Sequence, residues 1–291
     1  MVGPRHLTSG STGSPAASGA PANKQSAHAI APAVFAAGSC EWLPPTTTGN
    51  GLTVFLDPGH GGPDPGGFGS TENGTTIDER ALTLPTALDA ASMLRAAGYA
   101  VVMSRTTPGP VARLQPGDVS GTTYTLSGLH REVAARALCA NLAKANVLVS
   151  IHFNVGTTST QAGALTTYDA VRSFSARNLA LANLVQEDVM ASLHAHKSWQ
   201  VPNDGVTTDD QVGNALTTAG ANYGHLLVLG PAKAGFQSTP SMMPGVLTEP
   251  LFLTDPFEGS LAASRAGQAA IGTGIARAIA TFLGHPIQNG L

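Results

Sequence analysis

The feature that most constrains the fold is a repeated alternation between short apolar runs and longer segments with helical spacing. Apolar runs bounded by glycine and proline are typical of buried strands, whereas apolar residues three and four positions apart are typical of helices that cover a sheet. Strands that alternate with helices in this way indicate a mainly parallel, twisted sheet with helices on both faces. We therefore expect one α/β domain with a sheet of about six strands.

The expected elements follow one another along most of the chain. Strands are predicted at 52–57, 99–105, 146–152, 163–168, 225–230 and 245–253. Helices are predicted at 79–97, 129–144, 175–194 and 260–283. Pro85 interrupts the first helix, so its first turn is expected to be kinked or separate. The segments at 106–128 and 197–224 are expected to be irregular.

The first part of the chain differs in composition from the rest. Residues 1–27 are rich in Ser, Gly, Ala and Pro, and such a segment cannot bury enough apolar surface to offset its ordering entropy. The apolar run at 29–37 is short and contains Pro32, so it fits a signal peptide poorly. We therefore expect residues 1–50 to be a flexible segment that tethers a folded domain of residues 51–291.

Composition excludes several classes of protein. The net charge is −3 and no Lys/Arg cluster is present, which argues against a nucleic-acid partner. No apolar run reaches the roughly 18 residues of a transmembrane helix. Two cysteines are too few for a disulfide-dense scaffold or a multi-cysteine zinc module. Charged residues make up only 11% of the chain, which suggests an exported protein.

The two cysteines leave two interpretations open. Cys139 lies in an apolar helical segment, and Cys40 lies in the N-terminal part of the chain. In one interpretation, Cys139 is a small buried hydrophobe and Cys40 an exposed thiol. In the other, a disulfide between them fastens residue 40 to the core, as an oxidising compartment allows.

Residues with metal-binding chemistry follow the ends of predicted strands. His60 follows the first strand in LDPGHGG, His152 follows the third in SIHFN, and Glu249 ends a late strand. Each histidine alone is more often structural, and Glu79, in the first turn of a helix, is more often a residue that offsets the helix dipole. Because parallel strand ends meet at one edge, the combination favours a zinc site of His60, His152 and a carboxylate, with Glu79 the natural choice.

The other histidines have no pattern that indicates a site. His194 and His196 are two residues apart near a helix end, so they do not face one another and are expected at the surface. No partner pattern is found for His6, His28, His130, His225 and His285.

An ordered set of segments supports a more specific interpretation. The segments are LDPGHGG at 56–62 followed by DPG at 64–66, ERALTL at 79–84, VVMSR at 101–105, RALCANLAKANVLVSIHFN at 136–154 and VLTEPLFLTD at 246–255. In this order they resemble the motifs of the zinc-dependent N-acetylmuramoyl-L-alanine amidases of the AmiC and CwlC type, which hydrolyse peptidoglycan. The resemblance covers roughly residues 52–283.

The resemblance implies a role for each candidate residue. His60, Glu79 and His152 would bind Zn²⁺, and Glu249 would be the catalytic carboxylate. The substrate would be peptidoglycan or a muropeptide, cleaved between N-acetylmuramic acid and L-alanine, and the protein would act outside the cytoplasm, in the cell wall or secreted. The sequence departs from the motifs at Pro250 and Leu251, and 106–128 and 197–244 match them poorly.

Three alternatives remain open at this point. A catalytically silent amidase-like domain would bind peptidoglycan or regulate a partner. A different zinc hydrolase would use the same site on a small amide or peptide. A structural α/β domain without metal would hold His60 far from His152.

Overall fold

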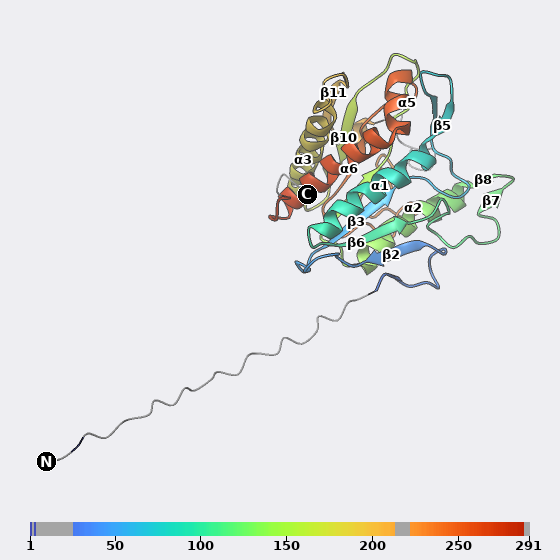
Figure 1. Ribbon diagram of the computed structural model, residues 1–291. Coiled ribbons are helices and arrows are strands. Elements are labelled where there is room, and N and C mark those ends of the chain that lie inside the picture. Colours follow the sequence, from blue (N-terminus) through green and yellow to red (C-terminus); the bar gives the residue numbers. More distant parts are fainter. Residues whose placement is uncertain (2, 4–25, 213–221, 288–291) are drawn as a thin grey trace.

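A computed structural model describes residues 1, 3, 26–212 and 222–287 (Figure 1). Within them, the central sheet has eight strands in the order β1-β2-β6-β3-β9-β12-β10-β11. These strands are β1 (His28–Ala29), β2 (Ser39–Leu43), β3 (Thr53–Pro58), β6 (Ala100–Arg105), β9 (Val147–Ile151), β10 (Ala164–Tyr168), β11 (Asn203–Thr208) and β12 (Gly245–Glu249).

The middle of the sheet is parallel. Strands β6, β3, β9 and β12 run parallel to one another, and β10 and β11 form a second parallel pair. The pairings of β1 with β2, β2 with β6 and β10 with β12 are antiparallel. The predicted α/β domain with a mainly parallel sheet is confirmed, although the described sheet is mixed and has eight strands rather than about six.

Helices cover both faces of the sheet, as expected (Figure 1). On one face, the side chains of Val54 and Leu56 pack into a core formed with α1 (Glu79–Ala96), α3 (Ser175–His194) and α6 (Arg265–Phe282). On the other face, Phe55 packs with residues of α2 (Leu126–Leu142). This alternation along β3 is the two-residue period of a strand that is buried on both sides.

The prediction of a strand at 225–230 is wrong. These residues form turns, and the strand in this part of the chain is β11 at Asn203–Thr208, within a segment expected to be irregular. Leu226, Val228 and Leu229 are buried against the α2 side of the core, and this burial explains the apolar run. An apolar run alone does not distinguish a buried turn from a buried strand.

Two helix predictions also need correction. Pro85 lies inside α1 without dividing it. The predicted helix at 260–283 is two helices, α5 (Pro256–Ala263) and α6, which meet at Ser264. The Ser264 hydroxyl accepts a hydrogen bond from the Gly267 amide, which satisfies one of the amides left free at the start of α6.

The domain begins before residue 51, contrary to the expected boundary. Strand β2 pairs with β6, and Phe35 is fully buried. Cys40 forms a disulfide with Cys139 in α2, so the disulfide interpretation is confirmed. Residues 2 and 4–25, which belong to the expected flexible segment, lie outside the described residues.

Short elements complete the described chain. They are the hairpin of β4 (Phe68–Ser70) and β5 (Thr76–Asp78), the hairpin of β7 (Val119–Ser120) and β8 (Thr123–Tyr124), and the 3₁₀ helix η1 (Asp209–Gln211). None of the helices in the described ranges combines the length and apolar character needed to cross a lipid bilayer.

Candidate metal site and active-site pocket

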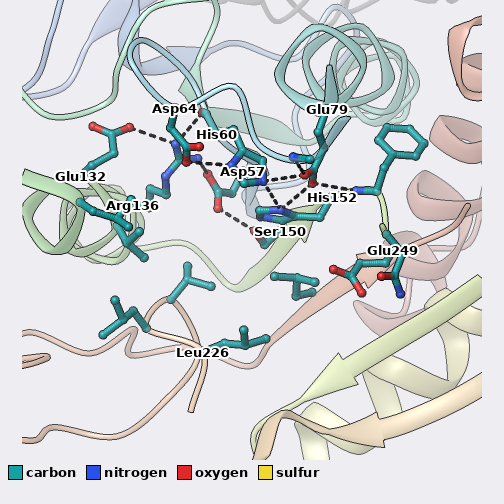
Figure 2. A pocket seen from close by; sticks show the side chains of 18 of the residues that line it. Asp57, His60, Asp64, Glu79, Glu132, Arg136, Ser150, His152, Leu226 and Glu249 are labelled. Atoms are coloured by element: carbon teal, nitrogen blue, oxygen red, sulfur yellow. Dashed lines mark hydrogen bonds and ion pairs between the residues drawn. The ribbon is translucent and has the colours of Figure 1, made fainter. Parts of the chain in front are cut away.

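The candidate residues gather at one edge of the sheet. His60 lies two residues beyond β3, His152 directly follows β9, and Glu249 is the last residue of β12. These three strands are neighbours and run parallel, so their carboxyl ends meet, which is where ligands bind in open α/β sheets. Glu79, at the start of α1, reaches the same place, and all four residues line one pocket (Figure 2).

Three side chains converge on one point. His60 Nε2 lies 2.9 Å from Glu79 Oε2, and His152 Nδ1 lies 3.0 Å from Glu79 Oε1. The two ring nitrogens lie 3.1 Å apart. For zinc ligands about 2.0–2.2 Å from the metal, tetrahedral geometry separates the ligand atoms by roughly 3.3 Å. The group therefore fits a divalent cation, with one position left for another ligand.

The electrostatics of the group also favour a cation. Burial opposes a charge on His60, yet Glu79 and Asp64 raise the pKa of this histidine to about 10. Burial opposes ionisation of Glu79, yet His60 and His152 hold the pKa of Glu79 well below its usual value. The lowered pKa keeps the Glu79 carboxylate ionised, and the raised pKa of His60 reflects the negative charge of Glu79 and Asp64, so the carboxylates make this point favourable for a cation.

The backbone fixes the orientation of Glu79. The amide of Gly67 donates to Glu79 Oε2 at 2.9 Å, and the amide of Phe153 donates to Oε1 at 2.9 Å. Gly66 has a φ of +72°, and a Cβ at this position would come within 2.6 Å of the His60 ring and 2.7 Å of Glu79 Oε2. Glycine is therefore required at position 66 for the loop to pass this close to the site.

A network of buried charges braces the turn that holds His60. Arg136 donates to Asp57 Oδ1 at 2.6 Å, to the Pro58 carbonyl at 2.9 Å and to the His60 carbonyl at 2.7 Å. The Ser150 hydroxyl donates to the other oxygen of Asp57. Figure 2 shows this network beside the three converging side chains. Arg136 is thus a positioning residue for His60.

A second buried arginine supports the same turn. The Arg105 side chain is fully buried and donates to the carbonyls of Pro58 and Gly59 and to the Thr83 hydroxyl. Sequence reasoning assigned no role to Arg105, Arg136 or Asp64. All three lie inside the motif segments quoted above, and that was the only signal that could have marked them.

Glu249 has the surroundings of a proton-transfer group. Its side chain is buried, and Oε2 has no hydrogen-bond partner among the described residues. Burial, together with the nearby carboxylate of Glu79, raises the pKa of Glu249 to about 8. A carboxyl group tuned toward neutral pH suits general acid–base chemistry.

The other histidines lie in varied places. His194 and His196 are exposed, as expected. His28 lies beside Trp42, and His130 lies beside Phe236. His225, for which the sequence indicated no partner, lies between two aspartates. His6 lies outside the described residues.

Comparison with known proteins identifies the family. The family model described as N-acetylmuramoyl-L-alanine amidase matches residues 54–281. The chain belongs to this amidase family. It is 27% identical over 152 residues to the germination-specific N-acetylmuramoyl-L-alanine amidase of Bacillus subtilis, a match that covers 52% of this chain and 58% of that protein. The chain therefore matches less than two thirds of the curated amidase's length.

Solved amidase structures share the fold. The N-acetylmuramoyl-L-alanine amidase from Clostridium difficile 630 is 26% identical, with a TM-score of 0.56 over 81% of this chain and 98% of that one. The CwlD amidase from Clostridioides difficile, solved in complex with the GerS lipoprotein, is 21% identical, with a TM-score of 0.61 over 80% of this chain and 98% of that one. These matches confirm the α/β amidase fold.

Proposed function

We propose that this chain is a zinc-dependent amidase that cleaves the bond between N-acetylmuramic acid and the L-alanine of the peptidoglycan stem peptide. The observation that carries the proposal is the convergence of His60, Glu79 and His152, with Glu249 in the same pocket. Membership of the amidase family supports the reaction class.

The residues present suit zinc better than other common cations. Two imidazole nitrogens and one carboxylate are a ligand set found in zinc hydrolases, which keep one position open. Zn²⁺ in such a site lowers the pKa of water and polarises a carbonyl oxygen. His60, Glu79 and His152 would hold the ion, while Asp64 holds the His60 ring through Nδ1.

Glu249 carries the proton transfers in this proposal. In its ionised form, the Glu249 carboxylate accepts a proton from the attacking water as the water oxygen bonds to the carbonyl carbon. It then donates that proton to the L-alanine nitrogen as the bond between the carbonyl carbon and this nitrogen breaks. A single group serves both steps because the acceptor in the first step becomes the donor in the second. General acid–base catalysis of this kind contributes about 10²–10⁴-fold to the rate.

Replacing Glu249→Gln tests the assignment. The variant should bind as much zinc as the wild type, while its release of free stem peptide from a purified muropeptide should fall by about 10²–10⁴-fold. Glu187→Gln removes the same charge from an exposed site on α3 and should leave turnover unchanged. Mass spectrometry of the released peptides, with zinc analysis of each protein, gives both readouts.

Each remaining outcome of that experiment has a clear meaning. Undiminished cleavage by Glu249→Gln would refute the role of Glu249. A wild-type protein that binds zinc and sediments with insoluble peptidoglycan, yet releases no peptide, would favour a non-catalytic peptidoglycan-binding domain. Cleavage of small acyl-amino-acid amides but not of muropeptides would favour a different zinc hydrolase.

The substrate and the disulfide support a location outside the cytoplasm, in the cell wall or secreted. The bond between Cys40 and Cys139 is of the kind that persists in oxidising compartments. Fractionation of producing cells, with immunodetection of the chain, tests this location. Recovery only from the cytoplasm would contradict it.

A further inference from the structure

A second group of side chains with metal-binding chemistry shares no residue with the His60, Glu79 and His152 group, although its histidine, His225, lines the same pocket. Asp169 directly follows β10, Asp209 begins η1 after β11, and His225 lies in the turns that follow. His225 Nδ1 lies 3.1 Å from Asp169 Oδ2 and 3.2 Å from Asp209 Oδ1. Both aspartates are buried, with exposed fractions of 0% and 1%.

Backbone amides hold both carboxylates so that one oxygen of each faces His225 Nδ1. Asp169 Oδ1 accepts hydrogen bonds from the amides of Val171 and Arg172, at 2.7 and 3.0 Å. Asp209 Oδ2 accepts one from the amide of Leu226, at 3.0 Å. The remaining oxygens, Asp169 Oδ2 and Asp209 Oδ1, point at the same ring nitrogen. This is how outer hydrogen bonds orient carboxylate ligands around a metal.

The histidine alone does not satisfy this pair of carboxylates. Its Nδ1 carries at most one proton, and Asp169 Oδ2 is a buried oxygen without a hydrogen-bond partner among the described residues. The Arg172 guanidinium donates instead to Leu229, Gly230 and Ser241, and the Tyr223 hydroxyl donates to Pro231. Among the described residues, His225 is thus the only basic side chain paired with these two carboxylates, and the Arg172 guanidinium acts on Asp169 only through its charge.

We propose that Asp169, Asp209 and His225 form a second metal site that binds a divalent transition-metal cation, for which Zn²⁺ is the best match. Two carboxylates and a neutral imidazole balance the charge of one divalent ion. Zn²⁺ accepts both ligand types, and the ligand separations of 3.1 and 3.2 Å match the roughly 3.3 Å expected around it.

The position of this site suggests a structural role. The ion would join the end of β10, the start of η1 and the turn at His225. Leu226 and Val228, immediately after His225, line the pocket that also contains His60 and Glu249. A cation held by His225 would therefore fix one wall of the active-site pocket, while catalysis stays with the first group of ligands.

Metal stoichiometry tests the proposal. After saturation with Zn²⁺ and dialysis, the full wild-type chain should retain two zinc ions per chain, whereas Asp169→Asn and Asp209→Asn should each retain one. Asp210→Asn removes an exposed carboxylate next in sequence to Asp209 and should retain two. Circular dichroism establishes that each variant is folded. One zinc in the wild type, or two in both aspartate variants, would overturn the proposal.

A second measurement distinguishes zinc binding at Asp169, Asp209 and His225 from zinc binding at His60, Glu79 and His152. In His152→Ala, calorimetric titration with Zn²⁺ should still show one binding event, and the double variant His152→Ala/His225→Gln should show none. Because His225 is partly exposed, its replacement tests the site without creating a buried cavity. Absence of binding to a folded His152→Ala protein would overturn the proposal and leave the amidase assignment standing.

Discussion

Oδ2 of Asp64 lies 2.8 Å from Nδ1 of His60, so the Nδ1–H of this ring donates to the carboxylate and Nε2 is left to face Glu79. The hydrogen bond sets the tautomer and the direction of the imidazole. Carboxylates in this position behind a metal-binding histidine also raise its basicity.

Replacing Asp64→Ala should therefore weaken zinc binding by about 10–100-fold without removing a ligand. Competition with a zinc chelator of known affinity measures the change. Glu72→Ala, which removes an exposed carboxylate from the β4–β5 turn, is the matched control and should bind zinc like the wild type. Equal affinities for Asp64→Ala and the control would contradict the positioning role.

Arg136→Met should destabilise the fold strongly, because it leaves the buried carboxylates of Asp57 and Glu132 without their shared cation. Breaking a buried ion pair in this way costs about 3–5 kcal/mol. Urea unfolding measures the loss. Arg131→Met breaks a pair that is half exposed on the arginine side and should cost at most about 1 kcal/mol. Similar losses in the two variants would refute the bracing role.

Reduction of the Cys40–Cys139 disulfide should lower the free energy of unfolding. The bond closes a loop with a sequence separation of 99, and loss of a native disulfide typically costs about 2–5 kcal/mol. Unfolding with and without dithiothreitol measures the difference. The double variant Cys40→Ala/Cys139→Ala should show no response to the reductant. A wild-type midpoint that is equally unresponsive would mean that the bond does not form.

Glu258 should make stability depend on pH. Burial raises the pKa of this carboxyl from 4.5 to about 7, although the amides of Phe252 and Gly163 oppose the shift. The folded state then holds the proton more tightly than the unfolded state. The stabilisation is fully present below about pH 4.5 and is lost as the pH rises through about 7.

The matched variant for this effect is Glu258→Gln, which stays uncharged throughout. The wild type should lose stability relative to Glu258→Gln as the pH rises across that window, as measured by urea unfolding at several pH values. A difference between the two proteins that stays constant, or that changes in the opposite direction, would contradict the shifted pKa.

Much of the fold followed from hydrophobic periodicity. The strands that contain Phe55, Val102 and Leu148 are buried on both faces of the sheet. Each of them is therefore a continuous apolar run in the sequence. The same signal failed at Leu226 and Val228, which are buried in turns against the sheet. Pairing of β2 with β6 depends on contacts far apart in sequence, so the composition of residues 1–50 concealed it.

The candidate site was accessible to sequence reasoning for a different reason. His60, His152 and Glu249 each follow or end a parallel strand, and parallel strand ends meet in space. Asp169 and Asp209 also lie just beyond strand ends. Their convergence on His225 was not foreseen, because β11 was not predicted and the segment containing His225 was expected to be a strand.

The central claim is that His60, Glu79 and His152 hold one zinc ion, and anomalous diffraction tests it most directly. Crystals of the full chain grown with Zn²⁺, measured on both sides of the zinc absorption edge, should show a peak about 2.0–2.2 Å from His60 Nε2, His152 Nδ1 and a Glu79 oxygen. A zinc-saturated crystal with no peak at that point, or with one of the two imidazoles turned away from it, would contradict the account.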